Sequence, residues 1–136
     1  MSDALYHDAI LALAKDRRHA GRLDAPTHSH TSDNPLCGDR VTIDIDRAAD
    51  GTVRRIGHFV RGCVLCQAAA AALAASVEGQ GPAALAAAEA ALARVLAGEN
   101  TPENGVWAAF LPVARHTSRL DCVRLPLAAA KPVFEA

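Results

Sequence analysis

The sequence has almost no net charge and no long apolar run. Its 136 residues include 14 Lys and Arg against 15 Asp and Glu, which gives a formal net charge of -1. A balance this close to neutral argues against a nucleic-acid surface and against a polybasic membrane surface. The alanine and leucine tracts are interrupted well before the roughly 20 residues that a membrane span needs. We therefore expect neither nucleic acid nor a membrane as a partner.

The N-terminus also lacks the pattern of a secretory leader. It reads "MSDALYHDAI", with acidic residues early, no basic flank before an apolar stretch and no small-residue cleavage site. We therefore expect a cytoplasmic protein, in which thiols stay reduced. The length fits a single domain over residues 1–136, and a chain of this size needs no disulfide framework to fold. The four cysteines are then expected to serve chemistry or packing.

Hydrophobic periodicity in the first half of the chain predicts a helix followed by strands. Residues 4–16 have the near-helical spacing of an amphipathic helix, and residues 18–36 form an irregular connection that we expect to contain a short edge strand. Residues 40–46 alternate apolar and polar side chains, and a turn at Asp50 leads into a second strand over residues 52–60. These two strands are expected to form a hairpin with one buried face.

The second half of the chain is predicted to be helical. An alanine-rich helix is expected to begin at Cys63. A further helix follows over residues 82–98, then a shorter one over 102–110 and a last one over 118–130, in which Pro126 makes the continuation uncertain. The predicted architecture is α+β, a small antiparallel β-sheet of about three strands packed against five or so helices.

Three of the cysteines fall where a metal site could form. Cys37 precedes the hairpin, Cys63 opens the alanine-rich helix and Cys122 lies in the last helix. Unpaired N–H groups at a helix start favour a thiolate, so Cys63 is suited to be a ligand or a nucleophile. If the hairpin returns the chain to the helix start, Cys37, Asp39 and Cys63 meet. Three thiolates and one carboxylate can hold zinc or iron.

The alternative is that the four cysteines are unrelated, since a free cysteine is among the most buried residue types. The spacing of Cys37, Cys63 and Cys122 matches no zinc motif, so the residues alone leave both interpretations open. Cys63 and Cys66 also form a Cys-x-x-Cys pair on one helical face, as in thioredoxin-like redox enzymes. That hypothesis is disfavoured because the βαβ context is missing. Cys66 is better explained as a small buried thiol than as a ligand or sulfur relay.

Four segments carry a more specific pattern: "LYHDAI", "NPLCGDRV", "FVRGCVLCQAAAA" and "SRLDCVRLPLAA". In this order, and over nearly the whole chain, they resemble the U-type iron-sulfur assembly proteins, namely IscU, SufU and the N-terminal domain of NifU. The resemblance implies an α+β domain with a metal or cluster site at one exposed end. Carried over by motif, the ligands would be Cys37, Asp39, Cys63 and Cys122, and they would hold Zn2+ or a 2Fe-2S cluster.

Within that family the chain is most similar to the SufU-like branch. The long separation of Cys63 and Cys122 is typical of the branch with an insertion there, and Arg119 matches the same pattern. Asp121 stands where IscU-like proteins have a histidine, so a histidine ligand is excluded at that position. Either Asp39 or Asp121 then supplies the oxygen ligand.

The resemblance implies a role in iron-sulfur cluster biogenesis. In the first hypothesis the chain is a non-enzymatic scaffold, which receives sulfur from a cysteine desulfurase, assembles a cluster and passes it to apo iron-sulfur acceptor proteins. Asp39, a hard ligand among soft thiolates, would keep that cluster labile. In the alternative the chain is a SufU-like zinc-dependent sulfurtransferase, with Cys37 as the sulfur acceptor that activates the desulfurase. The sequence does not decide the oligomeric state, so a homodimer stays an alternative to a monomer.

Overall fold

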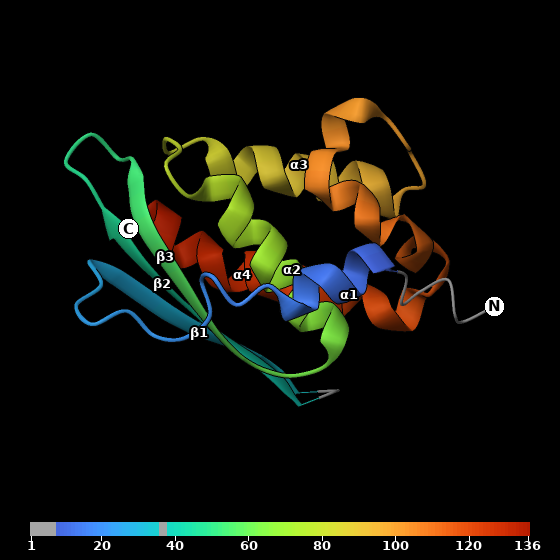
Figure 1. The fold of residues 1–136 in the computed structure, drawn as a ribbon, viewed down its shortest axis with the longest axis horizontal. Helices are drawn as coiled ribbons and strands as arrows, with labels where there is room; N and C mark the ends of the chain where they lie inside the picture. The colour runs from blue at the N-terminus through green and yellow to red at the C-terminus, as the bar shows by residue number, and fades with distance from the viewer. Residues whose placement is uncertain (1–7, 36–37) are drawn as a thin grey trace.

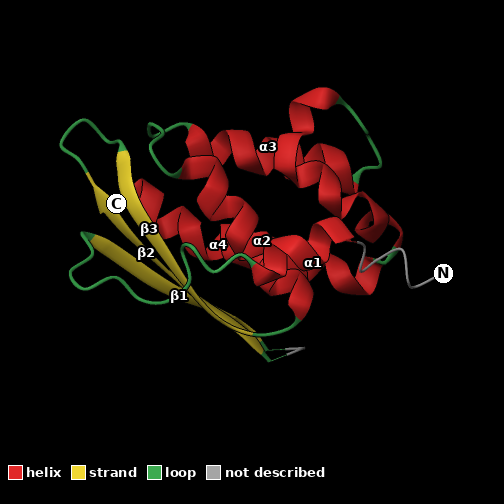
Figure 2. Ribbon diagram, viewed as in Figure 1, coloured by secondary structure: helices red, strands yellow, loops and turns green. Residues whose placement is uncertain are grey.

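In the computed structural model, which describes residues 8–35 and 38–136, a three-stranded antiparallel sheet carries helices on one face (Figure 1, Figure 2). The strand order is β1-β2-β3, so each strand pairs with its neighbour along the chain. This arrangement confirms the predicted α+β fold. The elements, in order, are α1 (Asp8–Lys15), β1 (His28–Asn34), β2 (Asp39–Arg47), β3 (Val53–Arg61), α2 (Val64–Val77), α3 (Ala84–Leu96), η2 (Pro102–Arg115), η3 (Thr117–Arg119) and α4 (Leu120–Glu135).

The predicted hairpin is confirmed in β2 and β3. Val41, Ile43 and Ile45 alternate along β2 and are fully buried in the core. β1 pairs with the other edge of β2 over all 7 of its residues, so the short edge strand expected within residues 18–36 is a full strand. Because one face of the sheet is buried, the register of the strands is strongly specified.

Helix α2 runs through the middle of the molecule. Its alanine-rich sequence packs against α1, α3, α4 and β3. Small side chains let these neighbours approach closely, and a helix that is apolar all round is stable only when it is enclosed. The predicted start is also confirmed, because Cys63 is the N-cap residue of α2. No helix in the described part of the chain is long and apolar enough to cross a membrane.

Two of the predicted helices differ from the structure. The segment expected as a short helix over residues 102–110 is a longer run of 3-10 turns, Pro102–Arg115, with non-helical backbone at Gly105 (φ 57°, ψ -133°). Helix α4 continues through Pro126 and Pro132, although each proline removes one backbone donor. Pro126 is buried with the core residues of α4, so packing outweighs the lost hydrogen bond.

A buried carboxylate, that of Asp44, lies on the face of the sheet opposite Ile43 and Ile45 and binds the segment before β1. Asp44 of β2 accepts hydrogen bonds from Arg22 Nε at 2.6 Å and from the Leu23 N–H at 3.1 Å, and Ser29 Oγ also donates to it. Burial alone would raise the pKa of Asp44, but these hydrogen bonds outweigh it and the pKa lies below its ordinary value. The segment between α1 and β1 is thereby fastened to the sheet.

His58 of β3 is a buried titratable group. It is 4% exposed, and within residues 8–35 and 38–136 its Nε2 has no hydrogen-bond partner. Burial lowers the pKa of His58 to about 4, an effect that His19 and Arg17 reinforce and Asp16 opposes. The folded protein therefore holds a neutral imidazole at this position at neutral pH.

Unfolding should become easier as the pH falls from about 6.5 to about 4. In that window the unfolded chain takes up a proton at His58 that the folded chain does not, so the free energy of unfolding falls by up to about 3 kcal/mol. Aspartates, with an ordinary pKa of 3.8, titrate mainly below this window, and His58→Gln leaves the contribution of every other group in place. Urea unfolding midpoints of the wild type and of His58→Gln, measured across the window, test this. A pH slope that persists unchanged in His58→Gln would contradict it.

Candidate metal centre

One end of the sheet brings together two of the predicted ligands. Asp39 is the first residue of β2, and the antiparallel strand β3 ends at Arg61, which lies opposite Arg40. Cys63 follows this strand end after one residue, Gly62, and is the N-cap residue of α2. The hairpin therefore places Asp39 next to Cys63, as the sequence led us to expect.

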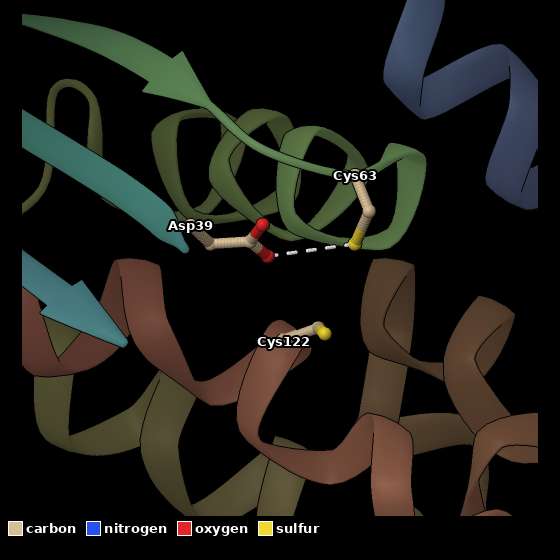
Figure 3. A group of neighbouring side chains, drawn as sticks. All are labelled: Asp39, Cys63 and Cys122. Atoms are coloured by element: carbon tan, nitrogen blue, oxygen red, sulfur yellow. Dashed lines mark hydrogen bonds between the residues drawn. The ribbon is translucent and has the colours of Figure 1, made fainter. Parts of the chain in front are cut away.

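Cys122 reaches the same end of the sheet from α4. It lies in the first turn of that helix, and α4 packs against β1 and β2. In Figure 3, Asp39 and Cys63 lie on one side and Cys122 approaches from α4 on the other. The ligand atoms of these three side chains all lie within 4.8 Å of one another. We call these three residues, Asp39, Cys63 and Cys122, the thiol-carboxylate group.

Contacts within the thiol-carboxylate group are close. The Cys63 thiol donates a hydrogen bond to Asp39 Oδ2, with a sulfur-to-oxygen distance of 3.6 Å (Figure 3). Asp39 is 6% exposed and Cys122 is 5% exposed, whereas Cys63 is half-buried. The group is therefore shielded from water on most sides, and Cys63 is its most accessible member.

The donor set suits a thiophilic metal. Thiolates bind zinc at about 2.3 Å and carboxylates at about 2.0–2.2 Å, so neighbouring ligand atoms of a tetrahedral centre are roughly 3.5 Å apart. The 4.8 Å spread of the group exceeds this by roughly 1 Å, which side-chain rotation can close. Two soft thiolates and one carboxylate fit zinc or iron better than magnesium or calcium, which prefer oxygen ligands.

The other predicted site residues are placed differently. Cys37, the fourth predicted ligand, lies outside the described residues; in the sequence it precedes Asp39 by two positions. Asp121 is exposed and does not belong to the thiol-carboxylate group, so Asp39 is the carboxylate that the fold brings to the thiols. Cys66 is 0% exposed within the hydrophobic core and is likewise outside the group. Its burial agrees with a packing role.

Arg40 and Gly62 are the chain neighbours of the predicted ligands Asp39 and Cys63. Arg40 Nε donates to Asp33 Oδ1 at 2.6 Å, and this hydrogen bond lowers the pKa of Asp33. Gly62, between β3 and Cys63, closely approaches the Asp39 side chain. Our sequence analysis did not identify Gly62. The signal that could have found it is a glycine at the junction of a strand and a helix, directly before a predicted ligand.

Fold and site together define a small α+β domain with a thiol and carboxylate centre at one end of its sheet. The family of NifU-like N-terminal domains matches residues 5–106, which is more than half of the chain. The chain belongs to this family, the U-type iron-sulfur scaffold proteins that its motifs resemble. Cys122 lies beyond the matched residues, so its place in the thiol-carboxylate group comes from the structure.

A curated relative agrees with this assignment. The iron-sulfur cluster assembly scaffold protein IscU of Thermotoga maritima is 32% identical over 76 residues, which cover 56% of this chain. The same match spans 53% of that relative, so the comparison extends over about half of its length.

Solved structures show the same fold. The N-terminal part of a nitrogen-fixing NifU-like protein from Brucella abortus has a TM-score of 0.86 at 28% identity, and the match covers 98% of this chain and 94% of that one. An iron-sulfur scaffold candidate of the SUF system from Fervidobacterium islandicum AW-1 has a TM-score of 0.87 at 22% identity, covering 98% of this chain and 99% of that one. At that identity the second likeness shows the fold alone.

Cysteine substitutions should distinguish the metal-binding thiols of the thiol-carboxylate group from the buried thiol of Cys66. We expect Cys63→Ser and Cys122→Ser each to weaken Co2+ binding, because each removes a thiolate ligand. The loss should exceed the roughly 100-fold that is seen at most when a residue supporting a ligand is replaced. Cys66→Ala is the matched control and should keep wild-type affinity while lowering the free energy of unfolding by about 1 kcal/mol. Anaerobic Co2+ titrations, followed by thiolate-to-cobalt absorption, and urea unfolding measure the two effects. Equal losses of affinity in all three variants would contradict the grouping.

Proposed function

We propose that this chain is an iron-sulfur cluster assembly scaffold, which receives sulfur from a cysteine desulfurase, builds a cluster and passes it to apo acceptor proteins. The observation that carries the proposal is the thiol-carboxylate group, whose ligand atoms come from three separate elements and lie within 4.8 Å. Membership of the U-type family and the likeness to a relative named as an IscU scaffold support it. A continuous hydrophobic core through the described elements supports a single domain over residues 1–136.

The proposed binding residues are Cys37, Asp39, Cys63 and Cys122. Thiolates are the usual ligands of iron in clusters, and a carboxylate is a harder partner that binds the same iron less tightly. A scaffold must release its cargo, so one weak bond among the four is an advantage. Asp39 would therefore set how readily the cluster leaves.

Sulfur delivery to this site is proposed to be a thiol-persulfide exchange. A cysteine thiolate of the chain attacks the terminal sulfur of the desulfurase persulfide, so that a new S–S bond forms, the old one breaks and the desulfurase cysteine leaves as a thiolate. The transferred sulfur stays at the sulfane level, and an external electron donor must supply two electrons for each sulfide formed. Cys37 is the proposed acceptor, two positions before Asp39 in the connection between β1 and β2.

Zinc is the second candidate occupant, because the same donor set suits a tetrahedral zinc site and joins the starts of β2, α2 and α4. When bound, zinc would favour the thiolate forms and contribute folding free energy on the order of 10 kcal/mol. The chain would then act as a zinc-dependent sulfurtransferase: Asp39, Cys63 and Cys122 would hold the zinc, and Cys37 would be the thiolate that accepts sulfur.

Metal and labile-sulfide analysis of protein purified without oxygen distinguishes the two candidates. Iron with equimolar sulfide, and a visible charge-transfer band that moves to an apo acceptor, would support the scaffold. About one zinc per chain without sulfide, together with faster desulfurase turnover, would support the sulfurtransferase. Protein that binds neither metal after anaerobic reconstitution would contradict both.

A thiolate in place of Asp39 should slow cluster release. Asp39→Cys replaces the hard ligand with a soft one that holds iron more tightly, so transfer to an apo 2Fe-2S ferredoxin should slow by about tenfold or more. Visible circular dichroism follows the cluster as it appears on the ferredoxin.

Asp121→Cys is the matched control for this experiment, because it introduces the same thiol at an exposed carboxylate outside the thiol-carboxylate group. It should transfer its cluster at the wild-type rate. Faster transfer from Asp39→Cys than from the wild type, or equal slowing in both variants, would show that the residue-39 carboxylate does not set the release rate.

A further inference from the structure

The backbone at Gly62 lies against the side chain of Asp39. A Cβ atom added at Gly62 would stand 2.7 Å from Asp39 Cγ, 2.9 Å from Asp39 Oδ1 and 3.1 Å from Asp39 Cβ. Real Cβ atoms essentially never lie less than 3.0 Å from a heavy atom outside their own residue and its two chain neighbours. Any side chain at position 62 therefore competes with the Asp39 carboxyl group for the same space.

The other usual reasons for a glycine do not apply at this position. Gly62 is not in the left-handed region of backbone conformation, in which glycine is favoured. It is also exposed, so it does not fill a tight place in the core. The close approach of Asp39 is the feature of this position that a larger residue would disturb.

Asp39 has little freedom to give way. It is 6% exposed and pairs with Asn34 of β1 at the start of β2. The overlap would involve its Cγ as well as an oxygen, so the whole carboxyl group would have to swing and not only its tip. Such a rotation would break the contact of 3.6 Å between Asp39 Oδ2 and Cys63 Sγ.

We propose that Gly62 is a positioning residue for Asp39: by having no side chain, it lets the carboxylate lie beside Cys63 in the thiol-carboxylate group. The importance of this for metal or cluster binding rests on the proposed function, in which Asp39 is a ligand. Gly62 touches no cargo itself and acts through the position of the Asp39 side chain.

The test is a double-substitution cycle with Zn2+ alone as the probe, measured by competition with a chromophoric chelator. We expect Gly62→Ala to weaken Zn2+ binding roughly 10- to 100-fold, the usual loss when a residue that orients a ligand is changed. In the Asp39→Ala background the same change should alter affinity by less than about twofold, because its target is gone. Additive losses in the double variant, or wild-type affinity in Gly62→Ala when Asp39→Ala itself weakens Zn2+ binding, would overturn the proposal.

Gly81→Ala is the matched control. Gly81 is likewise outside the left-handed region. Apart from its own atoms and its two chain neighbours, no heavy atom of the described residues lies within 4 Å of a Cβ added there. It should bind Zn2+ as the wild type does. A loss in Gly81→Ala as large as in Gly62→Ala would overturn the proposal, since the effect would then follow from replacing an exposed glycine.

A second readout needs no metal. Three-bond NMR couplings to Asp39 Cγ report its χ1 rotamer in the metal-free protein, and Gly62→Ala should change this rotamer while Gly81→Ala should not. An unchanged rotamer in Gly62→Ala would overturn the positioning role even if affinity fell. A changed rotamer in a protein that binds no zinc in any form would support the positioning role and overturn only the role of Asp39 as a ligand.

Stability provides the same test if Gly62→Ala folds poorly. Asp39→Ala removes the two closest atoms, Cγ and Oδ1, and of the three nearest atoms leaves the Asp39 Cβ at 3.1 Å. The Asp39→Ala/Gly62→Ala variant should therefore unfold at a higher temperature than Gly62→Ala alone. A double variant no more stable than Gly62→Ala would overturn the proposal.

Discussion

The antiparallel register between β2 and β3 is the constraint on which both the core and the site depend. Because β2 begins beside the end of β3, the register places Asp39 next to the first turn of α2. The same register buries Val41, Ile43 and Ile45 beneath the helices. A slip by one residue would send every strand side chain to the opposite face. It would expose this apolar row and shift the carboxylate relative to the thiols, so the burial that fixes the core also fixes the site.

Burial of the Asp39 carboxylate costs free energy, because a carboxylate taken out of water loses its hydration. Hydrogen bonds at the opposite end of β2, which hold this strand to α4, contribute stability that offsets the cost. Arg47, the last residue of β2, donates hydrogen bonds to the carbonyl oxygens of Val133 and Phe134 near the end of α4, each at 2.9 Å. Its guanidinium also lies 5.9 Å from the centre of the Phe134 ring. β2 is thus tied to α4 at one end by hydrogen bonds, and meets it at the other end where Asp39 approaches Cys122.

The features that local patterns determine were predictable from the sequence, and those set by tertiary packing were not. The alternating strand and the alanine-rich helix have clear periodicities, and the approach of Asp39 to Cys63 follows from them because a hairpin returns to its starting end. Nothing local places Cys122, since its position depends on how α4 packs against β1 and β2. Pro126 by itself predicts a break in α4. The helix nevertheless continues through Pro126, and burial of this proline in the core explains why. The sequence shows a glycine at position 62 but not the carboxylate that approaches it.

The two halves of the thiol-carboxylate group therefore differ in what holds them. Asp39 and Cys63 are linked through one hairpin and the helix that follows it, whereas Cys122 is held by the packing of α4. Lifting α4 from the elements that it packs against, namely β1, β2, α2 and α3, would expose buried apolar side chains, among them Val123, Leu125 and Leu127. The cost is about 1.5–3 kcal/mol for each large one. A metal or cluster that enters beside the half-buried Cys63 needs no such exposure. On the proposed function, metal or cluster exchange at this end of the sheet would need only side-chain movement on a fixed backbone. A softer or harder ligand at position 39 would then change the exchange rate without changing the fold.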